Sequence, residues 1–280
     1  MFLPTILVKQ GEFGMSKPLF RWTVGACLQQ GLDILAESIN RTTKALGFDE
    51  WDWAVCHNGL NGEQVAFIQS VIGDRSIHLL AQNWATCPVM DNCQTPHRRD
   101  GSFEWNGNKC GGTMWKVCPA RMRMESHEIV MDNDVVLLRK FPQIDEWLAQ
   151  TEKALCLEEP IRFYGRYDCL FGPDPPFLNS GFMGFPPGFD YGAEIFKIWV
   201  QHGKYMNLSQ SDEQGLLTYT LSRQPNIRVG SEQMVEVLHR DYKTKLTGRE
   251  SGIHFTQANR IPHHHPWGEY QKIISSATTI

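Results

Sequence analysis

The sequence lacks the features that mark several large classes of protein. No apolar run approaches the length of about 18 residues that a membrane-spanning helix requires, so we expect no transmembrane segment. No internal repeat and no low-complexity tract is present. The formal net charge is −4 and the chain has no long basic run, which argues against nucleic acid as a partner. Repeat proteins, integral membrane proteins and nucleic-acid-binding proteins are therefore set aside.

Signals for secretion are missing as well. Residues 1–8 are apolar, but no cleavage site follows them, so a reducing, cytoplasmic compartment is the expectation. The 8 cysteines are then expected to be free thiols. Cys27, Cys56 and Cys169 stand in apolar stretches and are expected to be buried.

The chain does contain enough apolar material for one sizeable core, or for a core with a smaller lobe. It has 280 residues, of which 41% are hydrophobic and 21% are charged. Glycine and proline keep residues 1–18 irregular, and this segment is expected to be an arm. Residues 19–280 are expected to form a single domain.

Strand and helix patterns alternate along the first half of that domain. The expected order is a strand over residues 21–28, a helix over 32–47, a strand over 53–56, a helix over 62–72 and a strand over 77–80. This alternation predicts an α/β fold with a mostly parallel sheet and helices on both faces. In such sheets ligands bind beyond the carboxyl ends of the strands.

The rest of the chain is less regular. The expected elements are a loop or insertion over residues 84–112, a short helix over 113–123, a strand region over 127–138, a helix over 142–157, loops around a site over 165–192, and helices over 193–202 and 212–221. Within the first loop Cys87, Cys93, His97 and Cys110 could ligate zinc. Their spacings are not those of common zinc modules, so structural zinc is the minor alternative for this loop.

A pair of aspartates is the feature most informative about function. An apolar strand runs into Asp132, and Asp134 follows two residues later. If the strand bends there, both carboxylates can converge on one ion. Oxygen ligands suit Mn²⁺ or Mg²⁺, and such an ion keeps positions open for phosphate oxygens. The pair therefore indicates a metal site that could neutralise a leaving diphosphate.

A polar turn is the alternative interpretation of the same residues, because Asp-Asn-Asp is common in turns. The flanking residues favour the metal site. An apolar strand precedes Asp132, and residues 135–138 (Val-Val-Leu-Leu) follow the pair. A surface turn rarely has apolar flanks on both sides.

The aspartate pair and four further patterns occur in the order found in GT-A glycosyltransferases. The chain resembles that family over about residues 20–270. The patterns are Asp132-Asn133-Asp134 (the family's D-x-D motif), Trp115-Lys116 after two glycines, residues 178–185 with Asn179-Ser180-Gly181, residues 211–217 with Asp212-Glu213, and residues 253–267. The resemblance implies an α/β GT-A fold. It also implies metal-dependent transfer of a sugar from a nucleotide-sugar donor to a sugar, glycan or other hydroxyl acceptor. Residues 19–140 would be the nucleotide-binding half and residues 141–280 the acceptor-side half.

The resemblance also implies roles for single residues. Asp132, Asp134 and His254 would hold Mn²⁺ or Mg²⁺, Lys116 and Arg260 would face the diphosphate, Asn179 and Gly181 would touch the donor sugar, and Asp212 or Glu213 would contact the acceptor. In an inverting enzyme one of these last two carboxylates could be the general base, whereas a retaining enzyme requires none. Gln29 and Asn58 stand at expected strand ends and are candidates for contacts to the base or ribose.

The end of the chain resembles the closing segment H-F-x-G-x-x-K-P-W of glycogenin-like enzymes. In that segment the histidine is the third metal ligand and the basic residue holds the diphosphate. Gln257 replaces the usual glycine and extra residues precede Pro266, so one of the histidines at 263–265 could be the ligand instead of His254. The resemblance leans towards a retaining enzyme.

Two other functions stay open. A sugar-phosphate nucleotidyltransferase has a similar sheet, but it usually carries a glycine-rich loop with lysine or arginine after the first strand. Residues 27–31 do not resemble such a loop. A catalytically inactive relative could still bind nucleotide sugars or sugars, although the intact Asp132 and Asp134 argue against it.

Overall fold

The computed structural model describes fourteen stretches of the chain. They are residues 17–25, 27–57, 60–81, 104–105, 108–109, 116–117, 120–158, 164–174, 177–202, 210–237, 249–256, 268, 271–272 and 274–275. Several predicted features lie outside these residues: most of the arm, Asn58, Arg260, the histidines at 263–265, and the cysteines and His97 of the loop at 84–112.

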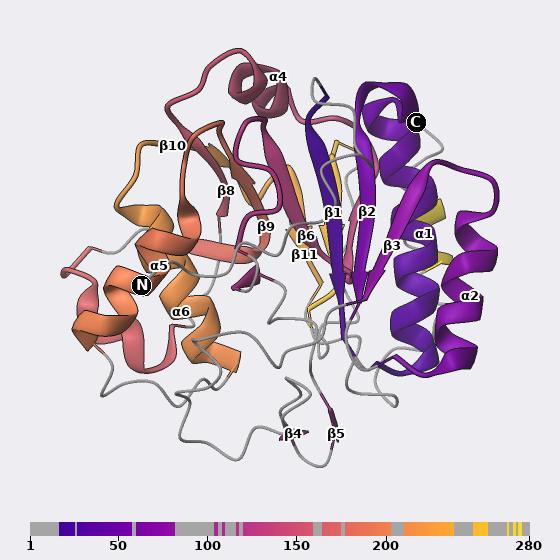
Figure 1. The fold of residues 1–280 in the computed structure, drawn as a ribbon, viewed down its shortest axis with the longest axis horizontal. Coiled ribbons are helices and arrows are strands. Elements are labelled where there is room, and N and C mark those ends of the chain that lie inside the picture. Colours follow the sequence, from indigo (N-terminus) through magenta and orange to yellow (C-terminus); the bar gives the residue numbers. More distant parts are fainter. Residues whose placement is uncertain are drawn as a thin grey trace.

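A seven-stranded sheet forms the centre of the molecule (Figure 1), with the strand order β10-β8-β9-β6-β1-β2-β3. The strands are β1 (Leu19–Val24), β2 (Asp52–His57), β3 (Ile77–Ala81), β6 (Glu128–Asp132), β8 (Ala154–Glu158), β9 (Leu178–Phe185) and β10 (Asn226–Val229). Neighbouring strands run parallel except at β9, which is antiparallel to both β6 and β8. The predicted α/β fold with a mostly parallel sheet is therefore confirmed.

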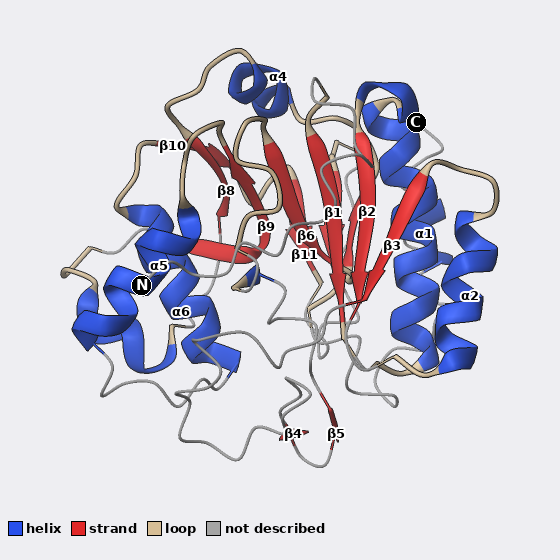
Figure 2. Cartoon of the chain, viewed as in Figure 1, coloured by secondary structure: helices blue, strands red, loops and turns tan. Residues whose placement is uncertain are grey.

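Helices cover both faces of this sheet (Figure 2), with α1 and α2 at the right of the view and α5 and α6 at the left. They are α1 (Gln29–Leu46), α2 (Gly62–Ile72), α4 (Pro142–Leu148), α5 (Tyr191–His202) and α6 (Gln210–Ser222), with 3₁₀ turns η1 (Phe48–Glu50) and η4 (Gly165–Leu170). Alternate residues of a strand point to opposite faces. Phe20 and Trp22 accordingly pack with α1 and α2, whereas Leu19 packs with α5 and α6. No helix in the described part of the chain has both the length and the apolar character needed to cross a bilayer.

A small second sheet brings a distant segment beside β7 (Val135–Leu137). It has the order β11-β12-β7, from β11 (Met234–Glu236), β12 (Gly252–His254) and β7. β12 is antiparallel to β7 and parallel to β11. A further two-stranded ladder consists of β4 (Glu104–Trp105) and β5 (Asn108–Lys109). The β7–β12 pairing matters most, because β7 begins directly after Asp134.

The helix predicted over residues 142–157 is wrong beyond its first half. α4 ends at Leu148, and the chain turns at Gln150, whose side-chain oxygen accepts backbone N–H groups of Glu152 and Lys153. β8 then carries Leu155 and Leu157 into the core. Two segments of different type thus share an apolar spacing that one long helix would also show.

The loops predicted over residues 165–192 are wrong in part, since only residues 171–174, 177 and 186–190 among those described lie outside helices and strands. This region contains η4, the fully buried strand β9 and the start of α5. The helix predicted over 113–123 does not extend across its described residues 120–123, which form bends, whereas Lys116 has 3₁₀ geometry and Val117 lies in a turn. The strand predicted over 21–28 lies earlier, at Leu19–Val24. Among the three cysteines expected to be buried, Cys56 is buried, Cys27 is partly buried and Cys169 is exposed.

Candidate metal and sugar-transfer site

Asp132 is the last residue of β6 and lies at the carboxyl edge of the parallel strands. Its neighbour in β1 is Thr23, whose hydroxyl donates to Asp132 Oδ1 over 3.2 Å. The chain then turns through Asn133 and Asp134 into β7. The bend that would let the two carboxylates converge is therefore present.

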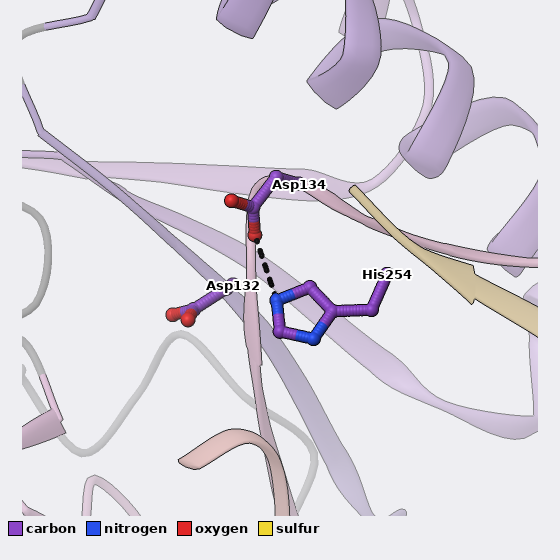
Figure 3. Close-up of side chains that lie close together, drawn as sticks. All are labelled: Asp132, Asp134 and His254. Atoms are coloured by element: carbon purple, nitrogen blue, oxygen red, sulfur yellow. Dashed lines mark ion pairs between the residues drawn. The ribbon is translucent and has the colours of Figure 1, made fainter. Parts of the chain in front are cut away.

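His254 reaches the same place from the end of β12. In the antiparallel pairing it stands opposite Val135, and the next backbone N–H, that of Phe255, donates to the carbonyl of Asp134 over 2.8 Å. His254 Nε2 lies 3.6 Å from Asp134 Oδ1. Figure 3 shows the imidazole pointing towards this carboxylate, with Asp132 beside them.

These three side chains have the chemistry and the spacing of a metal site. One ligand atom from each of Asp132, Asp134 and His254 lies within 4.8 Å of the others, and no other such group occurs among the described residues. Opposite ligands of an octahedral ion with bonds of about 2.1 Å stand about 4.2 Å apart, so small side-chain adjustments suffice. Two carboxylates and an imidazole suit Mn²⁺ well. The residues present therefore fit a divalent cation.

Lys116 links Asp132, one of the two aspartates, to Glu213 on α6. Its side chain is 1% exposed, and Nζ lies 2.9 Å from Asp132 Oδ2 and 3.3 Å from Glu213 Oε1. Nζ also donates to the carbonyl and the hydroxyl of Ser180, both over 3.3 Å. Burial alone would lower the pKa of Lys116, but the charges of Asp132 and Glu213 outweigh it and the pKa is raised. Lys116 is thus a charged bridge between two carboxylates.

Asp212 and Glu213, both buried in the first turn of α6, differ in what they face. Asp212 Oδ1 accepts the backbone N–H of Arg166 over 2.6 Å, which ties α6 to η4. A second tie lies one turn further on, where Gly215 packs against the Tyr164 carbonyl. Glu213 faces Lys116. Of the two, Glu213 is therefore the one linked to Asp132, through the ammonium group of Lys116.

Asn179 and Gly181 lie on β9 in the buried interior. The side-chain oxygen of Asn179 accepts the backbone N–H of Gly181. Gly181 in turn lies against the imidazole of His254. The structure thus brings seven of the predicted residues into one neighbourhood: Lys116, Asp132, Asp134, Asn179, Gly181, Glu213 and His254.

Asp212 has its separate role at η4, and Gln29 has a different local environment from the seven. Gln29 is exposed at the start of α1, and its side chain donates to Asp33 Oδ1 over 2.9 Å. Asn58 and Arg260 lie outside the described residues, so their contacts stay predictions. Sequence reasoning missed Thr23 and Ser180, which hold Asp132 and Lys116. For Thr23 the available signal was its place in an expected strand whose carboxyl end borders the site. Ser180 lies near the amino end of β9, which is antiparallel to β6 and was not predicted as a strand, so no such signal pointed to it.

The chain was compared with known protein families, curated sequences and solved structures. No family model and no curated protein sequence matches the chain. The galactosyltransferase LgtC, in complex with donor and acceptor sugar analogues, has a TM-score of 0.58 at 10% identity, over 94% of this chain and 97% of its own.

Two further solved structures agree. The bifunctional glycosyltransferase WbbM gives a TM-score of 0.60 at 11% identity, over 94% of this chain and 50% of its own. Mouse xyloside xylosyltransferase 1 gives 0.54 at 11% identity, over 88% of this chain and 99% of its own. At such identities the likeness concerns the fold. The chain accordingly has the GT-A fold of these glycosyltransferases, as the sequence patterns predicted.

Proposed function

We propose that this protein is a metal-dependent glycosyltransferase, which moves a sugar from a nucleotide-sugar donor to a hydroxyl acceptor. The observation that carries the proposal is the meeting of Asp132, Asp134 and His254 at the carboxyl edge of the sheet. In open α/β sheets this edge is where ligands bind. The solved structures of similar fold are named as glycosyltransferases rather than nucleotidyltransferases, which supports the same choice.

The metal ligands would hold Mn²⁺ or Mg²⁺. When bound, such an ion neutralises charge that develops on the departing diphosphate. The chain's own contribution is to fix the ligands. Thr23 and Lys116 hold the two oxygens of Asp132, and the β7–β12 pairing holds His254 beside Asp134. A ligand set fixed in this way loses little freedom when the ion binds.

Glu213 is the proposed catalytic or acceptor-side carboxylate, in preference to Asp212. Asp212 accepts a backbone N–H and secures η4, whereas Glu213 points to Lys116 and, through it, to Asp132. In an inverting reaction Glu213 would take the proton of the acceptor hydroxyl. In a retaining reaction, towards which the closing segment leans, it would contact the sugars without that role.

The remaining contacts of the proposed donor complete the assignment. Lys116 would contribute positive charge near the diphosphate, and Arg260 would fork onto its oxygens. Asn179 and Gly181 would border the donor sugar, and Gln29 and Asn58 the nucleoside.

Binding of nucleotide diphosphates tests this proposal directly. We expect a diphosphate from a panel of nucleotides to bind the protein in calorimetric titration, with Mn²⁺ strengthening the binding. A ligand that binds only the native state should also raise the melting temperature. Asp132→Asn should lose most of the increase in diphosphate affinity that Mn²⁺ gives the parent, because an amide oxygen is neutral and binds the ion more weakly.

A matched control is Asp145→Asn on α4. Asp145 is 66% exposed and pairs only with Lys140 among the described residues. This substitution should leave binding and melting temperature nearly unchanged. If no diphosphate binds the parent in the presence of Mn²⁺, or if both variants bind like the parent, the metal-dependent donor site is wrong.

A further inference from the structure

Gly181 stands where a larger residue would strike a metal ligand. A Cβ at this position would lie 3.1 Å from His254 Cε1 and 3.3 Å from His254 Nε2. It would also lie 2.7 Å from Asn179 Oδ1. The first two distances are tighter than ordinary van der Waals contact, and the third requires a neighbour to move.

Conformational freedom does not explain this glycine. Gly181 lies inside β9, and the glycines of the described chain with positive φ are Gly47, Gly73, Gly165 and Gly188. Its backbone is therefore one that other residues can adopt. A glycine inside a strand commonly marks a place where another group approaches closely. Here that group is the imidazole of His254.

The neighbours of Gly181 have little freedom to move aside. Asn179 has a short side chain, and its oxygen is held by the N–H of Gly181 itself. His254 is fixed by its place in β12, opposite Val135, and its ring lies between β9 and the carboxylate of Asp134. A methyl group at position 181 would push the ring towards Asp134 or turn it away from that carboxylate.

We propose that Gly181 is a positioning residue for the metal site, whose missing side chain allows His254 to direct Nε2 at the ion shared with Asp134. This inference rests on the proposed metal-dependent function. It also changes the role of the Asn179-Ser180-Gly181 segment. Ser180 accepts from Lys116, which holds Asp132, and Gly181 makes room for His254. The segment thus supports metal ligands that come from two different strands.

Gly181→Ala tests the inference through metal affinity, measured with Mn²⁺ alone by electron paramagnetic resonance and calorimetry. Displacing a group that orients a ligand typically lowers metal affinity by about tenfold to hundredfold, and we expect a loss in that range. The same substitution in a His254→Ala background should change affinity no further, because the group it acts upon is gone. Equal effects of Gly181→Ala in both backgrounds would overturn the inference.

Gly184→Ala is the matched control within β9. Its Cβ would meet Leu155 Cβ at 2.7 Å and the Trp147 ring at 3.0 Å, so it strains the strand away from His254. We expect it to lower the melting temperature while the folded protein keeps the Mn²⁺ affinity of the parent. If Gly184→Ala weakens Mn²⁺ binding as much as Gly181→Ala does, general strain in β9 is the cause and the inference fails.

A readout without metal separates this inference from the proposed function. The ring signals of His254 in the metal-free protein, assigned with His254→Ala, should shift in Gly181→Ala and stay in place in Gly184→Ala. If the parent binds no Mn²⁺, the proposed metal site is wrong even though the ring contact is real. Should Gly181→Ala be too unstable to study, the double variant with His254→Ala should recover part of the lost stability, because it removes the two contacts with the ring and leaves the one with Asn179 Oδ1. Absence of that recovery would contradict the contact.

Discussion

One face of strands β1 and β6 carries a charged cluster at each end. At the amino end Glu128, which is 0% exposed, accepts from Arg21 over 2.7 Å and from Arg121 over 3.3 Å. It also accepts the backbone N–H groups of Met122 and Arg123, each over 2.9 Å. Burial would raise the pKa of Glu128, but the two guanidinium groups outweigh it and the pKa is lowered. Protein groups thus surround this carboxylate.

The cluster at the carboxyl end is built from the same kinds of group with a different balance. Asp132 lies four residues after Glu128 on the same face of the strand, and its side chain is 22% exposed. The described residues there include three carboxylates and one ammonium group, those of Asp132, Asp134, Glu213 and Lys116. A buried charge cluster is therefore not in itself a site. Partial exposure and an excess of carboxylates distinguish the end that suits a cation from the end that secures the fold.

The sharpest test of this contrast is Glu128→Gln. The substitution leaves Arg21 and Arg121 without their carboxylate in the interior. Breaking a buried pair in this way costs about 3–5 kcal/mol, so we expect a loss of that order in the free energy of unfolding. Urea titration measures it, with Asp145→Asn as the exposed control expected to stay within about 0.5 kcal/mol. A loss below about 1 kcal/mol would mean that the amino-end cluster is not structural.

Asp134→Asn should produce the opposite pattern at the carboxyl end. Removing one of several neighbouring carboxylates relieves repulsion, so the metal-free protein should be unchanged or more stable by roughly 0.5–1 kcal/mol. Affinity for Mn²⁺ should fall about tenfold or more. Unfolding curves and Mn²⁺ titrations of the same preparation give both values. A destabilisation as large as that of Glu128→Gln would erase the distinction between the two clusters.

Acidification should lower the stability of the protein by a smaller amount, through His127 at the amino end of β6. His127 precedes Glu128, and its Nε2 lies 2.7 Å from the carbonyl of Gln150. Burial lowers the pKa of His127 below its ordinary value of 6.5. The unfolded chain therefore binds protons more readily than the folded one, and stability should fall as the pH drops below that value.

The lowered pKa of Glu128 acts in the same direction at lower pH, where protonation of its carboxylate removes stability. Urea unfolding at about pH 8 and about pH 5.5 measures the slope across the histidine range. His127→Gln should flatten that slope, whereas Asp145→Asn should not. Stability that rises on acidification of the parent would contradict the predicted sign.

The sequence was most informative where chemistry and strand pattern coincide. Asp132 and Asp134 were found because an apolar strand runs into them, and His254 because its segment resembles a known one. Glu128 lies in the same strand but carries no motif. Its role depends on Arg21 and Arg121, which no local spacing connects to it.

β9 shows why other parts of the fold were missed. Gly181 and Gly184 occur in its sequence, and glycine with Asn179-Ser180 is typical of turns. In the structure these glycines are required by close neighbours, His254 for one and Trp147 with Leu155 for the other. Such neighbours come from distant segments, so a local pattern cannot reveal them.

The pairing of β7 with β12 also sets an order of events during synthesis. About 120 residues separate Asp134 from His254, and chains grow at about 5–20 residues per second. The two aspartates therefore leave the ribosome roughly 6–24 s before the histidine that joins them. A ligand that needs all three side chains is bound only after β12 has paired with β7. Before that pairing, the nascent chain contains two of the three groups, the carboxylates of Asp132 and Asp134.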